Sequence, residues 1–230
     1  MRRHLSTPHA INSEGYPFIL LFALLSSGLF FLAPALGWMG VLLTIWCVYF
    51  FRDPPRRLPA IEGAVVAPAD GKVLPYRRVV PPPEMALGED PCLRVSIFMN
   101  IFNVHVNRIP TSGRIVELHY VKGKFFNASL DKASDGNERQ MITIETENGR
   151  RFGLVQVAGL IARRIVCNLE TGQAVKVGKR FGMIRFGSRV DLYLPDGLDP
   201  MVTEGQTTIA GETLMGFNSP SEPPPLEDQD

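Results

Sequence analysis

Cys92-Leu-Arg-Val-Ser-Ile-Phe-Met99 and Gly113-Arg-Ile-Val-Glu-Leu-His-Tyr-Val121 decide the fold of this chain. Both are rich in β-branched and apolar residues over the length of a strand. Similar runs occur at residues 63–68 and 140–146, and glycine, proline or asparagine bounds most of them. This punctuation is typical of strands joined by turns. The sequence therefore predicts a mostly β (α+β) domain, which we place at residues 53–217.

Two later stretches, residues 171–182 and 202–214, share a strand, glycine turn and strand rhythm. This rhythm is similar to the half-barrels of lipoyl and biotinyl carrier domains, so we expect barrel-sandwich elements. Neither stretch has a carrier lysine at a hairpin tip, which leaves a swinging-arm function unsupported. Short helices are expected at residues 159–167 and 129–136. Residues 218–230, rich in proline and acids, are expected to be a disordered tail.

The N-terminal part is apolar. Residues 18–51 contain no charged residue and are interrupted by Pro34 and Gly37. One straight helix of that length would measure roughly 50 Å, against a hydrocarbon core of about 30 Å. We therefore predict a bent membrane-anchoring hairpin at residues 17–52, either fully spanning or re-entrant, behind an N-terminal tail at residues 1–16.

Basic residues flank the hairpin on both sides, which favours both of its ends in the cytoplasm. They are Arg2 and Arg3 before it and Arg52, Arg56 and Arg57 after it. A cleaved signal peptide is the alternative, because Ala33-Pro34-Ala35 imitates a cleavage pattern. A second apolar run follows at once, and Glu14 lies in what should be a basic leader. We expect a protein at the cytoplasmic face of the cell membrane, whose anchor positions the domain without building its site.

Composition excludes several classes of function. The 24 basic and 23 acidic residues nearly cancel, giving a net charge of +1, and no basic block recurs that could follow a nucleic acid. The three cysteines, Cys47, Cys92 and Cys167, are odd in number and widely spaced. We therefore expect neither a disulfide framework nor a metal site.

Gly187-Ser188 lies between two strand-like runs, residues 183–186 and 190–194. A glycine permits a sharp backbone there, which could expose the serine hydroxyl to its own preceding carbonyl. Attack would give an ester, and elimination followed by hydrolysis would leave a ketone at position 188. A plain turn is the alternative interpretation of the same two residues.

A base is available in Asn103-Val104-His105-Val106-Asn107. In a strand, Asn103, His105 and Asn107 would share one face. Ala67-Pro68-Ala69-Asp70-Gly71 is a turn by itself, but Asp70 would gain a catalytic role if it lay beside His105. His119 is the other histidine outside the N-terminal tail.

Five separated pieces of residues 49–217 resemble the phosphatidylserine decarboxylase family, in its compact branch. They are Phe50-Phe51-Arg52-Asp53-Pro54, Pro68-Ala69-Asp70-Gly71, Phe98-Met99-Asn100 with Val104-His105-Val106-Asn107-Arg108-Ile109-Pro110, Asn137-Glu138-Arg139, and Phe186-Gly187-Ser188. Their order behind a membrane hairpin is what makes the resemblance specific.

The resemblance implies self-cleavage at Gly187 and Ser188 into a β chain (residues 1–187) and an α chain (residues 188–230), which stay together as a heterodimer. Ser188 would become a covalent pyruvoyl cofactor that forms a Schiff base with phosphatidylserine, releases carbon dioxide and yields phosphatidylethanolamine. His105, oriented by Asp70, would be the base and later the proton donor.

One element departs from the larger bacterial branch, which has two histidines where this chain has His105 and Arg108. Either His105 serves both steps or a group such as His119 assists. By charge alone, Lys122 and Lys124 join Asn103 and Asn107 as head-group candidates. Three other functions stay open: a decarboxylase of a related archaetidylserine-type lipid, a membrane-tethered serine hydrolase, and a carrier-type binding module without enzymatic activity.

Overall fold

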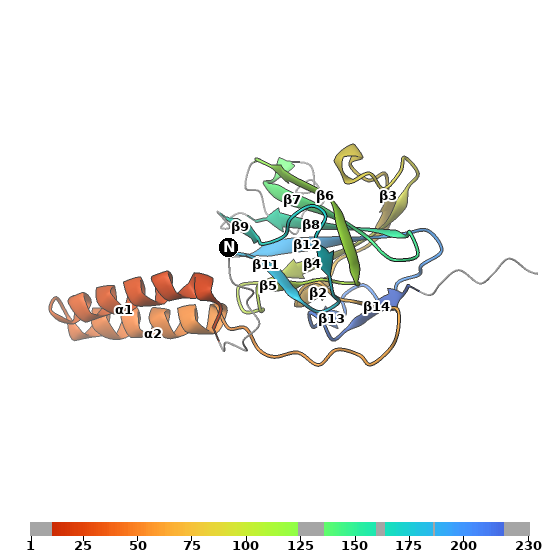
Figure 1. The fold of residues 1–230 in the computed structure, drawn as a ribbon. Coiled ribbons are helices and arrows are strands. Elements are labelled where there is room, and N and C mark those ends of the chain that lie inside the picture. Colours follow the sequence, from red (N-terminus) through yellow and green to blue (C-terminus); the bar gives the residue numbers. More distant parts are fainter. Residues whose placement is uncertain (1–10, 124–135, 160–163, 186, 219–230) are drawn as a thin grey trace, which may run out of the picture.

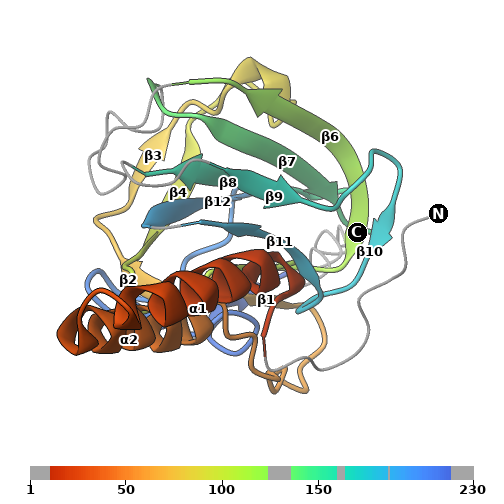
Figure 2. The same ribbon diagram turned by 90° about the vertical axis from the view of Figure 1, so that its left-hand side faces the viewer.

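The computed structural model describes residues 11–123, 136–159, 164–185 and 187–218. A pair of helices projects from one end of a β-rich domain, as Figures 1 and 2 show. The expected mostly β fold behind an N-terminal helical hairpin is confirmed.

The hairpin consists of α1 (Tyr16–Phe30) and α2 (Pro34–Phe50), after the 3-10 helix η1 (Ser13–Gly15). Pro34 opens α2, where its missing N–H costs no hydrogen bond.

Small residues let the two helices pack closely. A Cβ on Gly40 would lie 2.8 Å from Ser26, and one on Gly37 would lie 2.3 Å from the Phe30 ring. The Ser26 hydroxyl donates to the Gly37 carbonyl at 3.0 Å. Close contact through small residues with a hydroxyl hydrogen bond is typical of helices that pack in lipid.

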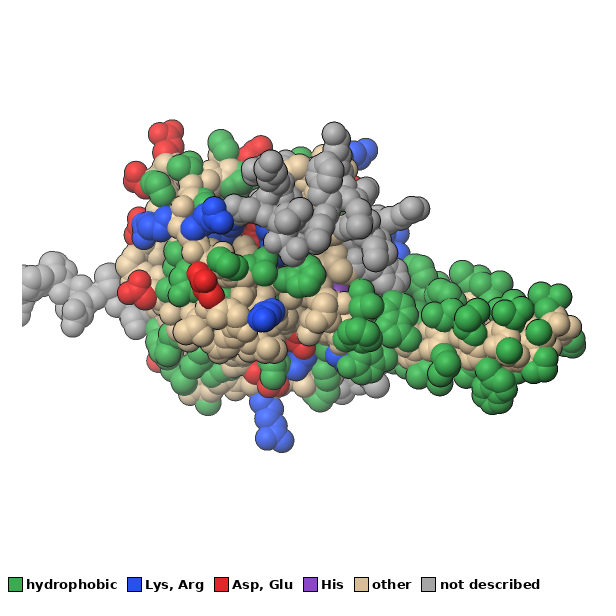
Figure 3. All heavy atoms as spheres, turned by 180° about the vertical axis from the view of Figure 1, so that it is seen from behind, with side chains coloured by type: hydrophobic (Ala, Val, Ile, Leu, Met, Phe, Trp, Pro, Cys, Tyr) green, Lys and Arg blue, Asp and Glu red, His purple; other side chains and the backbone are tan. Residues whose placement is uncertain are grey.

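The outer surface of the hairpin is apolar. Figure 3 shows it as a column of hydrophobic side chains projecting from a domain of mixed surface. Phe31 at the tip is 92% exposed. The helical stretch Ser13–Phe30 is long and apolar enough to cross a membrane, and Pro34–Phe50 is a shorter apolar helix.

The largest sheet has nine strands in the order β10-β6-β7-β8-β12-β4-β2-β13, with β3 also paired to β4. All of these pairings are antiparallel. The strands are β2 (Gly71–Val73), β3 (Arg77–Val79), β4 (Cys92–Met99), β6 (Gly113–Val121), β7 (Arg139–Glu145), β8 (Arg151–Ala158), β10 (Ala174–Val175), β12 (Ser188–Leu194) and β13 (Thr207–Thr208).

Two smaller sheets complete the domain. One joins β5 (Val106–Arg108), β11 (Arg180–Ile184) and β9 (Ile165–Cys167), and the other pairs β1 (Ala64–Val66) with β14 (Leu214–Phe217). The two glycine-turn stretches predicted as half-barrel elements form β10 with β11 and β13 with β14.

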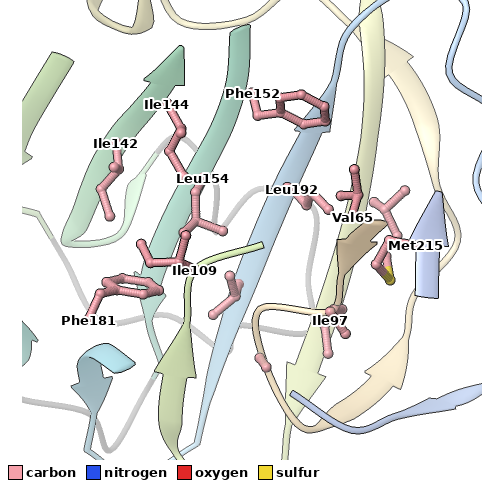
Figure 4. Packing of buried hydrophobic residues seen from close by; sticks show 14 of the residues in the cluster. Val65, Ile97, Ile109, Ile142, Ile144, Phe152, Leu154, Phe181, Leu192 and Met215 are labelled. Atoms are coloured by element: carbon pink, nitrogen blue, oxygen red, sulfur yellow. The ribbon is translucent and has the colours of Figure 1, made fainter. Parts of the chain in front are cut away.

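Alternation along β12 places Val190, Leu192 and Leu194 in the main core. Figure 4 shows Leu192 on β12 among buried residues from several strands. Phe181 of β11 belongs to the same core, so the three-stranded sheet packs over the inner face of the large one. Arg189 and Asp191 lie on the opposite face of β12 and form a buried ion pair, Nε to Oδ1 at 2.8 Å.

The helix expected at residues 159–167 is wrong for its last part. Ile165 and Val166 are β-branched and pair with β11, which satisfies their backbone groups in a sheet. Residues 160–163 lie outside the described residues, as does the expected helix at 129–136 apart from Gly136. A short 3-10 helix, η2 (Pro83–Met85), precedes β4.

Candidate active site

Ser188 is the first residue of β12, a central strand of the large sheet. Its register partners are Met99 at the end of β4 and Ala158 at the end of β8. Gly187 before it has φ +61°, a left-handed conformation that strains other residues. A Cβ there would meet nothing within 4 Å, so the backbone angle explains the glycine and the available space does not.

The Ser188 hydroxyl is fully buried and has no hydrogen-bond partner within the part of the chain that the structure describes. Apolar core residues surround it on this face, together with two buried amide side chains. Gln156 of β8 lies opposite Val190 and donates from Nε2 to Asn107 Oδ1 at 2.8 Å. Asn107 Nδ2 lies 3.7 Å from the Met99 sulfur. The Asn107 amide therefore reaches from β8 to β4 across the start of β12.

His105 precedes Asn107 by two residues, so their Cα atoms lie at most about 7 Å apart. Its Nδ1 is 3.0 Å from the backbone oxygen of Asn103. Because a carbonyl can only accept, Nδ1 must carry the proton, and the neutral ring keeps its lone pair on Nε2. Nε2 is buried without a hydrogen-bond partner in the described segments. The Asn103 carbonyl thus holds the ring in the tautomer that a general base requires.

The last residue of α2 packs on this histidine. The Phe50 and His105 ring centroids are 4.3 Å apart, with the planes tilted by 33°. Burial lowers the pKa of His105 from 6.5 to about 4, the hydrogen bond that the ring donates to the Asn103 carbonyl opposes this shift, and the Arg52 charge adds to it. At neutral pH the ring is therefore uncharged.

The hairpin base also reaches the segment that precedes Gly187. Arg185 forms an ion pair with Glu14 of η1, and its guanidinium lies 4.9 Å from the centroid of the Phe18 ring. A buried apolar cluster joins the two parts: Cys47, Phe50, Phe51, Val104, Val106 and Met183. The sequence predicts an anchor that positions the domain without building its site; in the structure the base of the anchor contacts both His105 and Arg185.

Asp70 does not contact His105. Its Oδ2 accepts from Arg56 at 2.7 Å, and its Oδ1 accepts from the backbone N–H of Ala210 at 2.8 Å. Asp53 likewise accepts from Arg180 at 2.7 Å and from Arg108 at 3.4 Å. We call these five charged residues the linker cluster, because Asp53 and Arg56 belong to the segment that follows the hairpin. We call Ser188, His105, Asn107 and Gln156 the serine site.

Comparisons with known proteins identify the family of this chain. Residues 43–216 match the family described as phosphatidylserine decarboxylase. The chain belongs to this family. The decarboxylases of this family are carboxy-lyases, and several of them are highly similar to the chain over most of its length.

Three relatives, each named phosphatidylserine decarboxylase proenzyme, align over 89% of this chain. The protein from Nitrobacter winogradskyi is 56% identical, with 83% of its own length covered. Those from Ruegeria pomeroyi and Rickettsia felis are 54% and 56% identical, with 94% and 89% covered.

In this phosphatidylserine decarboxylase family member, Arg108 cannot replace a second histidine as a base. Burial, followed by the Arg180 charge, lowers its pKa only to about 10, so it stays charged at neutral pH. It donates to the carbonyls of Gly178 and Pro54 and holds the linker. His119 is exposed on β6 and bonds to Glu117 at 2.9 Å. Neither residue joins His105.

The other head-group candidates are spread out. Asn103 closes a turn through Oδ1, which accepts from the Asn100 N–H at 2.9 Å. Lys122 is exposed just beyond β6, and Lys124 lies outside the described residues. In the described segments, no group of three or more His, Cys, Asp or Glu side chains could hold a metal ion.

Sequence reasoning assigned no role to Phe50, Gln156 or Arg185. Gln156 had a signal, since it is the one polar side chain in the apolar run of residues 152–158. Phe50 had none, because its contact with His105 depends on how α2 meets the domain.

Proposed function

We propose that this chain is a self-processing phosphatidylserine decarboxylase that converts phosphatidylserine into phosphatidylethanolamine and carbon dioxide. The observation that carries the proposal is the Ser188 hydroxyl, which is buried behind the left-handed Gly187 and has no hydrogen-bond partner among the described residues, in a member of this family. A buried unpaired hydroxyl is costly to keep, which argues that it serves a reaction.

In the self-cleavage step, the Ser188 hydroxyl oxygen attacks the Gly187 carbonyl carbon, and the Gly187–Ser188 amide bond breaks as the ester forms. Loss of the Ser188 α-proton then expels the Gly187 carboxylate and leaves dehydroalanine. Water replaces the enamine nitrogen, which departs as ammonia. The products are residues 1–187 with a new carboxylate and residues 188–230 with a ketone at the first position.

We assign His105 Nε2 as the base that takes the Ser188 hydroxyl proton, since this nitrogen is buried and unprotonated and accepts no hydrogen bond from any described residue. The orienting acceptor would be the Asn103 carbonyl. Asp70 would act at a distance, by fixing Arg56 and with it the linker that follows Phe50. As the amide bond breaks, this proton passes to the Ser188 nitrogen. In each later turnover, Nε2 would take a new proton from water and deliver it to the lipid product.

A pyruvoyl group at position 188 fits the residues present. It would need no added cofactor, and it would lie next to the Asn107 amide, whose Nδ2 has only a sulfur contact. Such a group supplies an electron sink for loss of carbon dioxide from a bound amine. The new chain end would stay in place because β12 pairs along its length with both β4 and β8. The two chains would therefore remain a heterodimer.

We further propose that the hairpin anchors the enzyme at the cytoplasmic face of the cell membrane. A lipid with two acyl chains is costly to extract into water, so an enzyme at the bilayer surface reaches the head group more easily. The apolar hairpin leads directly to Phe50 and the serine site.

Borohydride trapping tests the proposal. Added together with phosphatidylserine, borohydride should couple the lipid irreversibly to the 188–230 chain and inactivate the enzyme. A matched lipid without the amine, phosphatidic acid, should not be coupled. Coupling to the 1–187 chain, or no coupling by an active enzyme, would exclude a ketone at position 188.

A further inference from the structure

A short apolar turn lies beside the hairpin base. It joins β4 to the segment that carries His105 and contains Asn100, Ile101, Phe102 and Asn103. The Ile101 and Phe102 side chains are 37% and 57% exposed, although both are large and apolar. Two adjacent exposed apolar residues at a turn tip suggest contact with an apolar partner.

The turn satisfies most of its own backbone groups. The Asn100 side chain accepts from the Phe102 N–H at 2.8 Å, and the Asn103 side chain accepts from the Asn100 N–H at 2.9 Å. The Asn103 N–H donates to the Asn100 carbonyl at 3.1 Å. A turn closed in this way leaves few polar groups to be stripped of water if its tip enters lipid.

The turn is held at the level of the hairpin base. Arg52, just after α2, donates from one guanidinium nitrogen to the Phe102 carbonyl and from the other to the Tyr49 carbonyl, both at 2.8 Å. The same guanidinium stacks 3.8 Å from the Tyr49 ring centroid. Tyr49 is itself exposed, and aromatic and arginine side chains together are typical of the membrane–water interface.

We propose that the Ile101–Phe102 turn inserts into the lipid interface as a second membrane contact beside the hairpin. This rests on the proposed function, because it takes the hairpin to be in the bilayer. Arg52 ties the turn to Tyr49 at the base of the apolar hairpin, so the turn would meet the same lipid as the hairpin and not a separate protein.

The turn lies close in sequence to residues of the serine site. The turn begins just after Met99, the register partner of Ser188, and ends two residues before His105. A turn seated in lipid would therefore place the serine site at the membrane surface, on the side from which a head group arrives.

Bromine quenching in vesicles tests the insertion. Full-length Phe102→Trp is reconstituted in phosphatidylcholine vesicles whose acyl chains carry bromine, and its fluorescence is compared with that of the parent, which has Trp38 and Trp46. Met201→Trp is the matched control: Met201 is 53% exposed, and its N–H bonds to Met215 of β14. Bromine should quench the extra fluorescence that the tryptophan at position 102 gives over the parent. The extra fluorescence of the tryptophan at position 201 should not change.

The proposal would be overturned if the emission of the tryptophan at position 102 were the same in brominated and in ordinary vesicles. Quenching at position 102 that appears only when another protein is present would also overturn it. The readout needs no activity, so a chain that inserts its turn but never self-cleaves would refute the proposed function alone.

Enzyme kinetics give a second test. In active enzyme, Phe102→Ser should raise the KM for phosphatidylserine in vesicles several-fold with little change in kcat, and Phe102→Leu should restore the KM. An unchanged KM in Phe102→Ser would also count against insertion.

Discussion

The serine site and the linker cluster are both buried and polar, but their hydrogen bonding differs. In the linker cluster every oxygen of Asp53 and Asp70 has a donor within 3.4 Å. In the serine site Ser188 Oγ, His105 Nε2 and Gln156 Oε1 have no hydrogen-bond partner among the described residues. Satisfied charges hold two segments together, whereas the unsatisfied atoms fit the nucleophile and the base that we propose. The difference separates a structural role from a chemical one.

Removing the nucleophile should have the largest effect. Ser188→Ala lacks the only atom proposed to attack Gly187, so the protein should remain one chain of 230 residues without decarboxylase activity. A denaturing gel and a carbon dioxide release assay check this. The unfolding temperature should not fall, since the lost hydroxyl is buried without a hydrogen-bond partner among the described residues. Full activity in the uncut variant would refute the pyruvoyl proposal.

Removing the base should come next. His105→Ala should slow self-cleavage by about 100-fold or more, the range typical of general-base catalysis. The rate is read from the ratio of cut to uncut chain over time, with His119→Ala as the control, because His119 is exposed and bonds to Glu117 on its own strand. If His105→Ala were cut normally but inactive, the two steps would use different bases.

Changing the anchor's contact with the histidine should have a smaller effect. Phe50→Leu leaves an apolar side chain but removes the ring face, and slightly misplaced catalytic groups can cost about tenfold or more in rate. Phe50→Tyr should retain most of the rate. Phe31→Leu, at the exposed hairpin tip, is the matched control and should cleave normally.

Deleting residues 1–50 extends the same test to the whole anchor. Self-cleavage should be impaired, because Phe50, Phe18 and Glu14 are all lost. A folded truncated domain that cleaves at the normal rate would show that the contacts at Arg185 and His105 do not matter.

The pH dependence of the self-cleavage rate should show whether the histidine that acts as base is buried or exposed. The pKa of His105 is lowered from 6.5 to about 4, so its base form persists well below pH 6.5. The cleavage rate should stay flat from pH 8 to pH 6 and fall only as the pH nears 4, measured in short incubations. The unfolded chain binds the proton more readily, so this group also costs the fold stability as the pH falls from 6.5 toward 4. A midpoint near 6.5 would contradict the burial.

Breaking the linker cluster should affect the rate least. Asp70→Asn keeps an acceptor for the Ala210 N–H but loses the Arg56 ion pair, which should cost about 2 kcal/mol of stability. Urea unfolding measures this cost, and the cleavage rate should fall only a few-fold. A loss as large as that of His105→Ala would give Asp70 a direct catalytic role.

The sequence predicts the fold well where the pattern is local. The strand runs at residues 92–99 and 113–121 become β4 and β6 without a shift, and the apolar segment becomes a helical hairpin. Ile165 and Val166 were misassigned because their partner strand, β11, lies later in the chain. Pairing between distant strands is not visible in a local pattern.

Local sequence patterns also predict only part of the candidate site. Ser188 and His105 stand out by their motifs, but the group that orients the His105 ring could not be predicted. Asp70 was assigned to His105 by analogy with a triad, whereas its carboxylate bonds to Arg56 and the Asn103 carbonyl accepts from the histidine ring. A backbone carbonyl has no sequence signature. The position of Phe50 against His105 depends on tertiary packing alone.

The intact masses of the purified protein test the central claim most directly. If the Ser188 hydroxyl attacks Gly187, two chains should be found, residues 1–187 and residues 188–230. The short chain should be lighter by one ammonia than a peptide that begins with serine, because its terminal amine has been replaced by a ketone. A single mass for residues 1–230, in protein that decarboxylates phosphatidylserine, would contradict the account.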